Sequence, residues 1–467
     1  MPILKKGLTA GAGFLFGAGM AMAAAVTGIA DTWSGVALAG FGAAALAAVL
    51  TLLIFALLGR GWALTGYLCL LVLLMDATLR ARDDLQDTSA DWQSLAKLAV
   101  WAGALAIGLV HLPRTHRMIF RTPAVCIVLF GLWATMTAVY SPSPMFSVGA
   151  GMSFLGLALF TPAVLEKLKP ESVLYALAGT LAVFLVLSWL VYLFVPEIGS
   201  TSYYTTQGDM YRMSGLAGKP TNLGRLSATL IGTVFALVLM KRLDRKWAVL
   251  AVILALATLF ESQTRTALAG IVLAVAAVML RRRPVWLLLA LSAGGIALYA
   301  LGLRGIELDL EQVARPLARS GNVQEIFTFT GRTGIWKFVI GKIAESPWLG
   351  YGYGSSRIII AGGYSSEWGF TTQSSHNTLL QSLLTTGIIG TSLIVFMLAR
   401  QVKQFFTAPD PFCDVMLVFL LTNAMMESLI VGGAPGVLTL VWLITVYWRE
   451  RGHETTVRRL DPVYSQA

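Results

Sequence analysis

The chain has 467 residues, of which 56% are hydrophobic and 13% charged, and its mean hydropathy is +0.72. Soluble domains carry roughly twice that share of charged residues, so the composition excludes an ordinary soluble protein. Apolar runs of about 17–25 residues recur along the chain, which is long enough to cross a bilayer, whereas a transmembrane barrel would show short alternating segments. We therefore predict an all-α polytopic membrane protein with about 12–14 transmembrane helices.

The net charge of +11 follows membrane topology. The basic residues gather in gaps on one side of an alternating series of spans, as the positive-inside rule requires. They are Lys5, Lys6, Arg60, Arg114, Arg117, Arg121, the Lys241–Lys246 run, Arg281–Arg283, Arg400 and the Arg449–Arg459 tail. The excess is therefore interpreted as an orientation signal and a contact with anionic membrane lipid, and no nucleic-acid partner is predicted.

The N-terminus resembles a signal peptide, with Lys5 and Lys6 before an apolar, Ala-rich stretch. That stretch continues to about Ala30, beyond the 7–15 residues of a usual signal core, so we predict a retained first span. Fourteen spans are expected in all, which places both termini in the cytoplasm. In chain order they are 8–30, 35–58, 61–77, 95–112, 122–141, 147–166, 172–195, 223–241, 247–261, 265–281, 285–303, 376–400, 411–431 and 434–448. The short spans 61–77, 247–261 and 434–448 could instead be tilted, re-entrant or interfacial.

These spans divide the chain into an N-terminal bundle (1–303), a long outer segment (304–375), C-terminal helices (376–448) and a cytoplasmic tail (449–467). Two further polar segments, near 76–94 and 196–222, interrupt the bundle on the outer side. Loops as long as 304–375 are usually functional or disordered, and the Trp and Tyr content of this one argues against disorder.

The 304–375 segment contains its own helical signal at 333–345, where apolar residues recur near a 3.6-residue period. These residues are Ile335, Trp336, Phe338, Val339 and Ile343. The pattern predicts an amphipathic helix lying along the membrane surface. A flexible, aromatic loop, Gly350–Gly354, is expected after Pro347 ends the helix, and it offers Tyr351 and Tyr353 to a substrate.

His376 is the histidine that lies away from the basic segments, at the point where the long outer segment enters a span. Ser374 or Ser375 would cap the following helix, and a neutral imidazole in its first turn could accept a proton because the helix dipole disfavours the cation. Asn377 and Gln381 are four residues apart, so they are expected on the same helical face. The alternative is a histidine satisfied by hydrogen bonds at the headgroup level.

Several cations remain on the outer side, where positive-inside selection removes them from short loops. They are Arg212, Lys219, Arg225, Arg265 and Arg332. Such a group predicts an anionic ligand, and arginine suits phosphate because its fork binds two oxygens. The alternatives are pairing of Arg265 with Glu261, snorkelling of Arg225 to the headgroups, and solvated-loop positions for Arg212 and Lys219.

No metal site and no cofactor are predicted. The outer segments contain no Asp-x-Asp pair and no second histidine, and the carboxylates of 76–92 lack a metal-ligand spacing. Gly350–Gly354 lacks the lysine and the strand–helix context of a phosphate loop. Cys69, Cys126 and Cys413 all lie in or beside apolar runs, so we expect neither disulfides nor a zinc site.

Taken in order, several motifs resemble the signature of the O-antigen ligase and polymerase superfamily. They are Arg212-x-x-Gly215-x-x-x-x-Pro220-x-Asn222, Gly331-Arg332-x-x-x-Trp336, Pro347-Trp348-Leu349-Gly350-Tyr351-Gly352-x-Gly354, His376-Asn377-x-Leu379 and Gly387-x-x-Gly390. The resemblance covers roughly residues 200–400 and is strongest to the ligases that join O-antigen to the lipopolysaccharide core. One departure is the span count, since the family is usually drawn with about twelve.

The resemblance implies an enzyme of the bacterial inner membrane with a periplasmic active site. Its donor would be a glycan on undecaprenyl diphosphate, its acceptor a sugar hydroxyl of lipid A–core, and the transfer metal-independent and inverting. His376 would be the essential histidine, and Arg212, Arg265 and Arg332 the functional arginines. Lys219 and Arg225 carry over less directly.

Two other functions are consistent with the same residues. An O-antigen polymerase or a ligase that glycosylates pilin-like proteins differs only in its acceptor. A transporter of lipid-linked glycans or anions belongs to another class, and it predicts broken helices in matching halves with a mid-membrane site. The polar features instead collect at one membrane face.

Overall fold

The computed structural model describes residues 32–78, 92–120, 122–205, 208–281, 332–365, 372–431 and 433–464. The predicted spans 8–30 and 285–303 lie outside these residues, as do 304–331 and 366–371 of the long outer segment and most of the acidic stretch 76–92.

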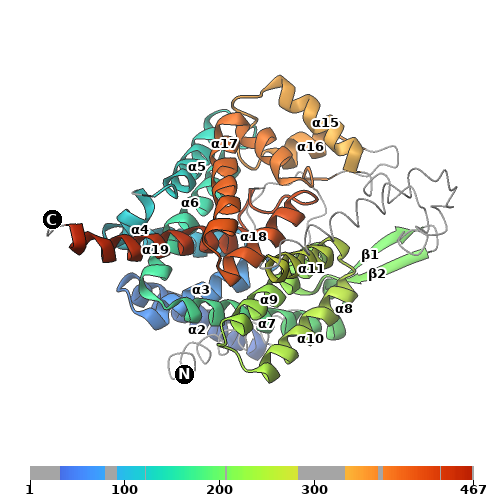
Figure 1. Ribbon diagram of the computed structural model, residues 1–467. Coiled ribbons are helices and arrows are strands. Elements are labelled where there is room, and N and C mark those ends of the chain that lie inside the picture. The colour runs from blue at the N-terminus through green and yellow to red at the C-terminus, as the bar shows by residue number, and fades with distance from the viewer. Residues whose placement is uncertain are drawn as a thin grey trace, which may run out of the picture.

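The described part of the chain is almost entirely helical (Figure 1). The N-terminal helices are α2 (Thr32–Leu57), α3 (Gly61–Met75), α4 (Trp92–Phe120), α5 (Val125–Met136), α6 (Pro144–Lys167), α7 (Pro170–Phe194), α8 (Pro196–Gly199), α9 (Pro220–Leu239), α10 (Arg245–Ser262) and α11 (Arg265–Leu280). After the gap come α15 (Arg332–Glu345), α16 (Ser356–Gly363), α17 (Thr378–Thr407), α18 (Pro411–Ala424) and α19 (Val437–Tyr464).

Five of these helices, α4, α6, α7, α9 and α17, are long and apolar enough to cross a membrane. Shorter apolar helices, α3, α5, α11 and α18 among them, pack around them. The all-α polytopic membrane fold is thus confirmed, while the number of spans stays a prediction. The described residues also contain two strands, β1 (Ser200–Thr205) and β2 (Gly208–Met213). They form an antiparallel hairpin that extends away from the helices (Figure 1).

Helix α6 is the most enclosed of the five, with 83% of its apolar window buried. It packs closely on α4 and α5 because glycines remove side chains at the contacts. A Cβ at Gly108 of α4 would lie 2.6 Å from Leu159, and one at Gly151 of α6 would lie 2.7 Å from the backbone of Thr135. Small residues at such crossings let membrane helices approach and gain van der Waals contact.

Helix α17 is broken at Gly387, where φ is +64° and ψ is −169°. The loop after α15 replaces the lost helical hydrogen bonds. The amides of Tyr351 and Gly352 donate to the carbonyls of Leu384 and Thr385, both at 2.9 Å, and the Ile388 amide donates to Pro347 at 2.8 Å. Backbone groups within a membrane protein require such partners. The prediction of a flexible loop at Gly350–Gly354 is therefore wrong, because this backbone is bonded to a helix.

The predicted span 411–431 is also wrong at its end, since α18 stops at Ala424. A hydropathy profile does not show that the Thr378 side chain forms hydrogen bonds with the backbone that follows Ala424. The Thr378 hydroxyl donates to the Glu427 carbonyl at 2.8 Å and accepts from the Leu429 amide at 3.0 Å. Residues 425–431 and 433–436 therefore belong to an irregular connection that contacts the start of α17, and α19 begins only at Val437.

Four helix ends meet on one face of the molecule. Asp76, which follows α3, accepts a hydrogen bond from the first amide of α19, at Val437, at 3.0 Å. The starts of α9 and α17 contact the same connection, through Arg225 and Thr378. Away from this face, the buried Asp414 in the first turn of α18 pairs with Arg281, which follows α11, and with Arg449, which lies within α19.

Candidate active site

Glu427 lies at the centre of a polar cluster on the face where α9, α17 and α19 begin. Its Oε1 lies 2.8 Å from Nη2 of Arg332, and its Oε2 lies 3.2 Å from Nδ1 of His376 and 3.7 Å from Nη1 of Arg225. The Glu427 side chain is only 8% exposed, whereas His376 is 26% exposed. The histidine is therefore the member of this pair that can meet a substrate.

The cluster keeps Glu427 ionised. Burial opposes ionisation, but the hydrogen bond from His376 and the charges of Arg225 and Arg332 outweigh it and lower the pKa of Glu427 to about 2. A carboxylate in that state accepts hydrogen bonds only. Its partner at 3.2 Å, Nδ1 of His376, therefore carries the proton.

Because Glu427 holds the proton on Nδ1, the lone pair of neutral His376 lies on Nε2. Nε2 is 3.1 Å from the Thr372 hydroxyl, which can donate to it. A carboxylate that fixes the tautomer and orientation of an imidazole is the arrangement used in hydrolase triads. His376 is thereby suited to accept a proton from a hydroxyl group.

The backbone at His376 differs from the prediction. The cap of α17 is Asn377, whose Oδ1 accepts from the Leu380 amide at 3.0 Å, and not Ser374 or Ser375. His376 therefore precedes the helix, with φ at +51°. Histidine is among the residues that tolerate this left-handed region, and such positions cluster where surrounding structure fixes a functional side chain.

Neighbouring polar side chains hold the His376 segment in place. The His376 amide donates to Ser374 Oγ at 3.2 Å, and the Ser375 amide donates to Oε1 of Gln381 at 3.0 Å. Gln381 is fully buried, and Asn377 donates to the Met425 carbonyl at 3.1 Å. Asn377 and Gln381 thus fix the loop that carries His376.

Arg225 lies one turn into α9 and is only 9% exposed, so it does not snorkel to the headgroups. Its Nε donates to the Thr221 carbonyl at 3.1 Å, and its Nη2 donates to Asn222.

Lys219, at the cap of α9, has an exposed side chain, but the surrounding protein removes part of its hydration. Desolvation lowers the pKa of Lys219, the charges of Arg225 and Arg357 lower it further, and Glu427 opposes both. Arg225 and Arg332 thus contact a single buried carboxylate, whose charge also acts on Lys219. One carboxylate cannot neutralise all three cations.

The structure does not place Arg212 and Arg265 in contact with this cluster. Arg212 is buried, and its Nε and Nη2 donate to the Ser262 carbonyl at the end of α10, at 3.1 and 2.6 Å. Arg265 is exposed at the first position of α11, and within the described residues no ion pair joins it to Glu261. The Thr264 hydroxyl donates to the Pro220 carbonyl at 3.0 Å. Helix α11, which begins at Arg265, therefore starts beside the end of α9 that carries Lys219.

The two tyrosines of the glycine-rich loop occupy different environments. Tyr353 is fully buried and packs edge-on against Phe130 at 5.9 Å, so we assign it to packing. Tyr351 donates to Oε2 of Glu345 at 2.8 Å. Its predicted contact with substrate stays a prediction.

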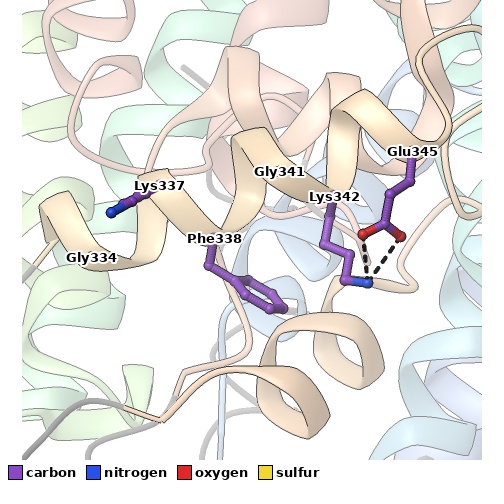
Figure 2. Close-up of a pocket in the computed structure, with 6 residues that line it drawn as sticks. All are labelled: Gly334, Lys337, Phe338, Gly341, Lys342 and Glu345. Atoms are coloured by element: carbon purple, nitrogen blue, oxygen red, sulfur yellow. Dashed lines mark hydrogen bonds and ion pairs between the residues drawn. The ribbon is translucent and has the colours of Figure 1, made fainter.

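A shallow depression of about 460 Å³ lies on α15 (Figure 2). Its lining comes from this helix alone: Gly334, Lys337, Phe338, Gly341, Lys342 and Glu345. Lys342 Nζ lies 2.9 Å from both carboxylate oxygens of Glu345 (Figure 2). We assign no chemistry to this depression, because Lys342 and Glu345 pair with each other and no other element contributes to its lining.

Among the described residues, no group of three His, Cys, Asp or Glu side chains could hold a metal ion. Cys69, Cys126 and Cys413 are free thiols.

Fold and cluster together define a polytopic membrane protein with a carboxylate–histidine–arginine centre where several of its helices begin. Residues 250–395 match the model of the O-antigen ligase family. The resemblance drawn from the motifs is thereby confirmed over this segment, which contains Arg265, Arg332 and His376. The earlier motif at 212–222 lies outside the match, so its assignment stays a prediction.

Two curated relatives are similar over a short stretch. The chain is 42% identical over 76 residues to a Rickettsia conorii protein provisionally named a polysaccharide ligase. It is 38% identical over 76 residues to a similarly named protein of Rickettsia felis. Each alignment covers 15% of this chain and 18% or 19% of the relative, so the chain aligns with less than a fifth of the length of each.

Glu427 is the main site residue that the sequence analysis missed. It fell inside the predicted span 411–431, and the prediction gave it no role. An ionisable residue within an apolar span is by itself a candidate for function, because its charge is costly in the membrane. That signal could have identified it.

Proposed function

We propose that the protein transfers a glycan from undecaprenyl diphosphate to a sugar hydroxyl of lipid A–core, as an O-antigen ligase. The observation that carries this proposal is Glu427 bridging His376 to Arg225 and Arg332, with a proton acceptor and phosphate-binding cations on one face. The family match over 250–395 supports a polysaccharide ligase at the coarser level.

The reaction is a single displacement with inversion. The acceptor oxygen attacks the anomeric carbon of the donor sugar, and the bond from that carbon to the diphosphate oxygen breaks. The hydroxyl proton passes to Nε2 of His376, and the diphosphate leaves with the bonding electrons. Because a diphosphate is already a good leaving group, proton removal from the acceptor is the main demand on the protein, worth about 10²–10⁴-fold.

Charge stabilisation of the leaving group falls to Lys219, Arg225 and Arg332, and the scheme uses no metal ion. Groups fixed in advance where charge develops lower a barrier most effectively. The starts of α9, α17 and α19 lie at the same place, and the positive ends of helix dipoles also favour an anion. Arg265 would extend this binding surface along the neighbouring start of α11.

We place this face in the periplasm and the termini in the cytoplasm of a bacterial inner membrane. Support comes from three cations that lie away from the helix starts at this face and make ion pairs. Arg281 follows the end of α11, and Arg400 and Arg449 lie more than three turns along α17 and α19. Cytoplasmic ends of spans are enriched in such cations. The amphipathic helix proposed for 333–345 corresponds to α15 and would rest at the periplasmic surface.

The test is transfer in proteoliposomes that contain the full chain, a donor glycolipid and purified lipid A–core. We expect a ligated product and released undecaprenyl diphosphate, and a loss of about 100-fold or more with His376→Ala. His116→Ala is the matched control, because His116 is exposed and bonds only to its own helix, at the Pro113 carbonyl. Extension of the donor glycan, or labelling of a pilin instead of lipid A–core, would reassign the acceptor to a polymerase or a protein ligase. Glycan crossing the bilayer without a new glycosidic bond would indicate a transporter and sink the proposal.

A further inference from the structure

A separate polar cavity adjoins the His376 cluster. It has a volume of about 170 Å³ and lies between the end of α3, the first turns of α9 and the segment that leads into α19. Its polar lining is made by Asp76, Asn222, Arg225 and Ser428, and leucines and small residues complete the wall. The proposed chemistry does not use Asp76, Asn222 or Ser428.

The cavity and the His376 cluster have a common wall. Arg225 lines the cavity and also pairs with Glu427, 3.7 Å away. Ser428 follows Glu427 in the chain, and its hydroxyl accepts a hydrogen bond from Ser374 Oγ at 2.8 Å, two residues before His376. A ligand in the cavity would therefore lie next to the proton acceptor.

The wall chemistry selects a particular kind of ligand. Asp76 accepts hydrogen bonds only, Arg225 donates only, and the Asn222 amide and Ser428 hydroxyl do both. A ring that carries several hydroxyl groups, each a donor and an acceptor, matches this mixture. The leucines supply an apolar wall for its C–H faces. A diphosphate fits poorly, because the Asp76 carboxylate would repel it.

The size of the cavity limits the ligand to one unit. At ~30 Å³ for each water in the liquid, the volume corresponds to on the order of five or six water molecules, which is the scale of a single sugar ring. The position of Asp76 is fixed, since it also accepts the Val437 amide at 3.0 Å. A Cβ at Gly436 would lie 2.7 Å from Asp76 Oδ1, so glycine at this position leaves the carboxylate room.

We propose that this cavity is a subsite for one neutral sugar unit, oriented by Asp76 and Asn222 beside His376. The proposal rests on the function proposed above and adds the part of the substrate that the anion-binding cations do not hold. The sugar comes either from the acceptor or from the unit of the donor next to the diphosphate, and the two sources share this chemistry.

The first arm of the test measures binding without catalysis. Saturation-transfer NMR on the full-length protein in detergent, with methyl α-glucoside and methyl α-galactoside as probes, should show contact with at least one of them. Ala434→Leu fills the cavity without removing a hydrogen bond and should abolish that contact. Asp76→Asn should weaken it by about 10- to 100-fold, as expected for loss of a hydrogen bond to a charged group. Ala99→Leu makes the same change on an exposed part of α4 and should alter nothing. Added pyrophosphate should not displace the glycoside.

The second arm measures the KM of each substrate in the transfer assay. A rise in the acceptor KM alone with Ala434→Leu assigns the subsite to the acceptor, and a rise in the donor KM alone assigns it to the donor. Unchanged glycoside contact and unchanged KM values in Ala434→Leu would overturn the subsite, even if transfer proceeds. A third outcome separates the two proposals. If the wild-type protein binds the glycoside but transfers nothing, and Ala434→Leu abolishes that binding, the subsite is supported and the proposed reaction is refuted.

Discussion

Replacement of Glu427 by glutamine is the substitution whose consequences the structure defines most sharply. The change keeps the size of the side chain but removes its charge, which leaves Arg225 and Arg332 without their shared carboxylate. The fall in the pKa of Glu427 from 4.5 to about 2 corresponds to roughly 3 kcal/mol of stabilisation of the ionised form, at about 1.4 kcal/mol per unit. Loss of one partner from a buried ion pair usually costs about 3–5 kcal/mol, which is the same range.

Catalysis should be affected separately from stability. Glutamine carries no charge and can present its NH2 group as well as its oxygen to Nδ1 of His376. The proton is then no longer fixed on Nδ1, and kcat should fall by about 100-fold or more. Affinity for pyrophosphate should stay the same or rise, because the internal anion that competes for the arginines is gone. Thermal unfolding in detergent, steady-state transfer and pyrophosphate binding measure the three effects. Glu345→Gln is the matched control, since Glu345 is exposed on α15 and pairs with Lys342. A Glu427→Gln protein with wild-type stability and kcat would refute the reasoning.

Three further predictions follow from named contacts. The stability that Glu427 contributes should be complete above about pH 4.5 and should be lost as the pH falls toward the folded-state pKa of about 2. The melting temperatures of wild type and Glu427→Gln should therefore converge in acid, and a constant difference between them would contradict this. Gly387→Ala should prevent folding or lower the melting temperature strongly, because its Cβ would lie 2.1 Å from the Trp348 carbonyl oxygen, and an unchanged melting temperature would show that α17 is not broken there. Arg332→Gln should raise the donor KM at least tenfold with little change in glycoside binding, whereas Lys342→Gln on the same helix should leave both unchanged; equal effects would remove Arg332 from the diphosphate site.

The sequence predicted those parts of the fold that hydropathy and spacing control. Apolar runs identified the helices, and the period of Ile335 and Val339 located α15 to within one residue. Both residues are buried in a cluster with Ile360 and Leu384, within the protein itself. Hydropathy did not predict the ends of helices that side chains determine. Thr378 interrupts the 411–431 run by bonding to its backbone, and Asn377 displaces the expected serine cap.

The roles of the site residues stay predictions, but the structure shows which of these residues lie together. His376 was chosen because it lies where the outer segment enters a span, and Arg332 because it is a cation on the outer side. The structure brings the two together through Glu427. Arg212 was also chosen as a cation on the outer side, but it bonds to the carbonyl at the end of α10. A single sequence does not show which helix carbonyls stay available for such a bond. Convergence of Asp76 and Glu427, which lie 351 positions apart, depends on tertiary packing that no local pattern encodes.

The central claim, that His376 accepts the acceptor proton, is tested most directly by chemical rescue. His376→Ala protein would be assayed for transfer in proteoliposomes with increasing concentrations of imidazole, beside wild type and His116→Ala. The account predicts a loss of about 100-fold or more that imidazole partly restores, with a rate that rises with pH as imidazole becomes neutral. Transfer by His376→Ala at the wild-type rate without imidazole would contradict it.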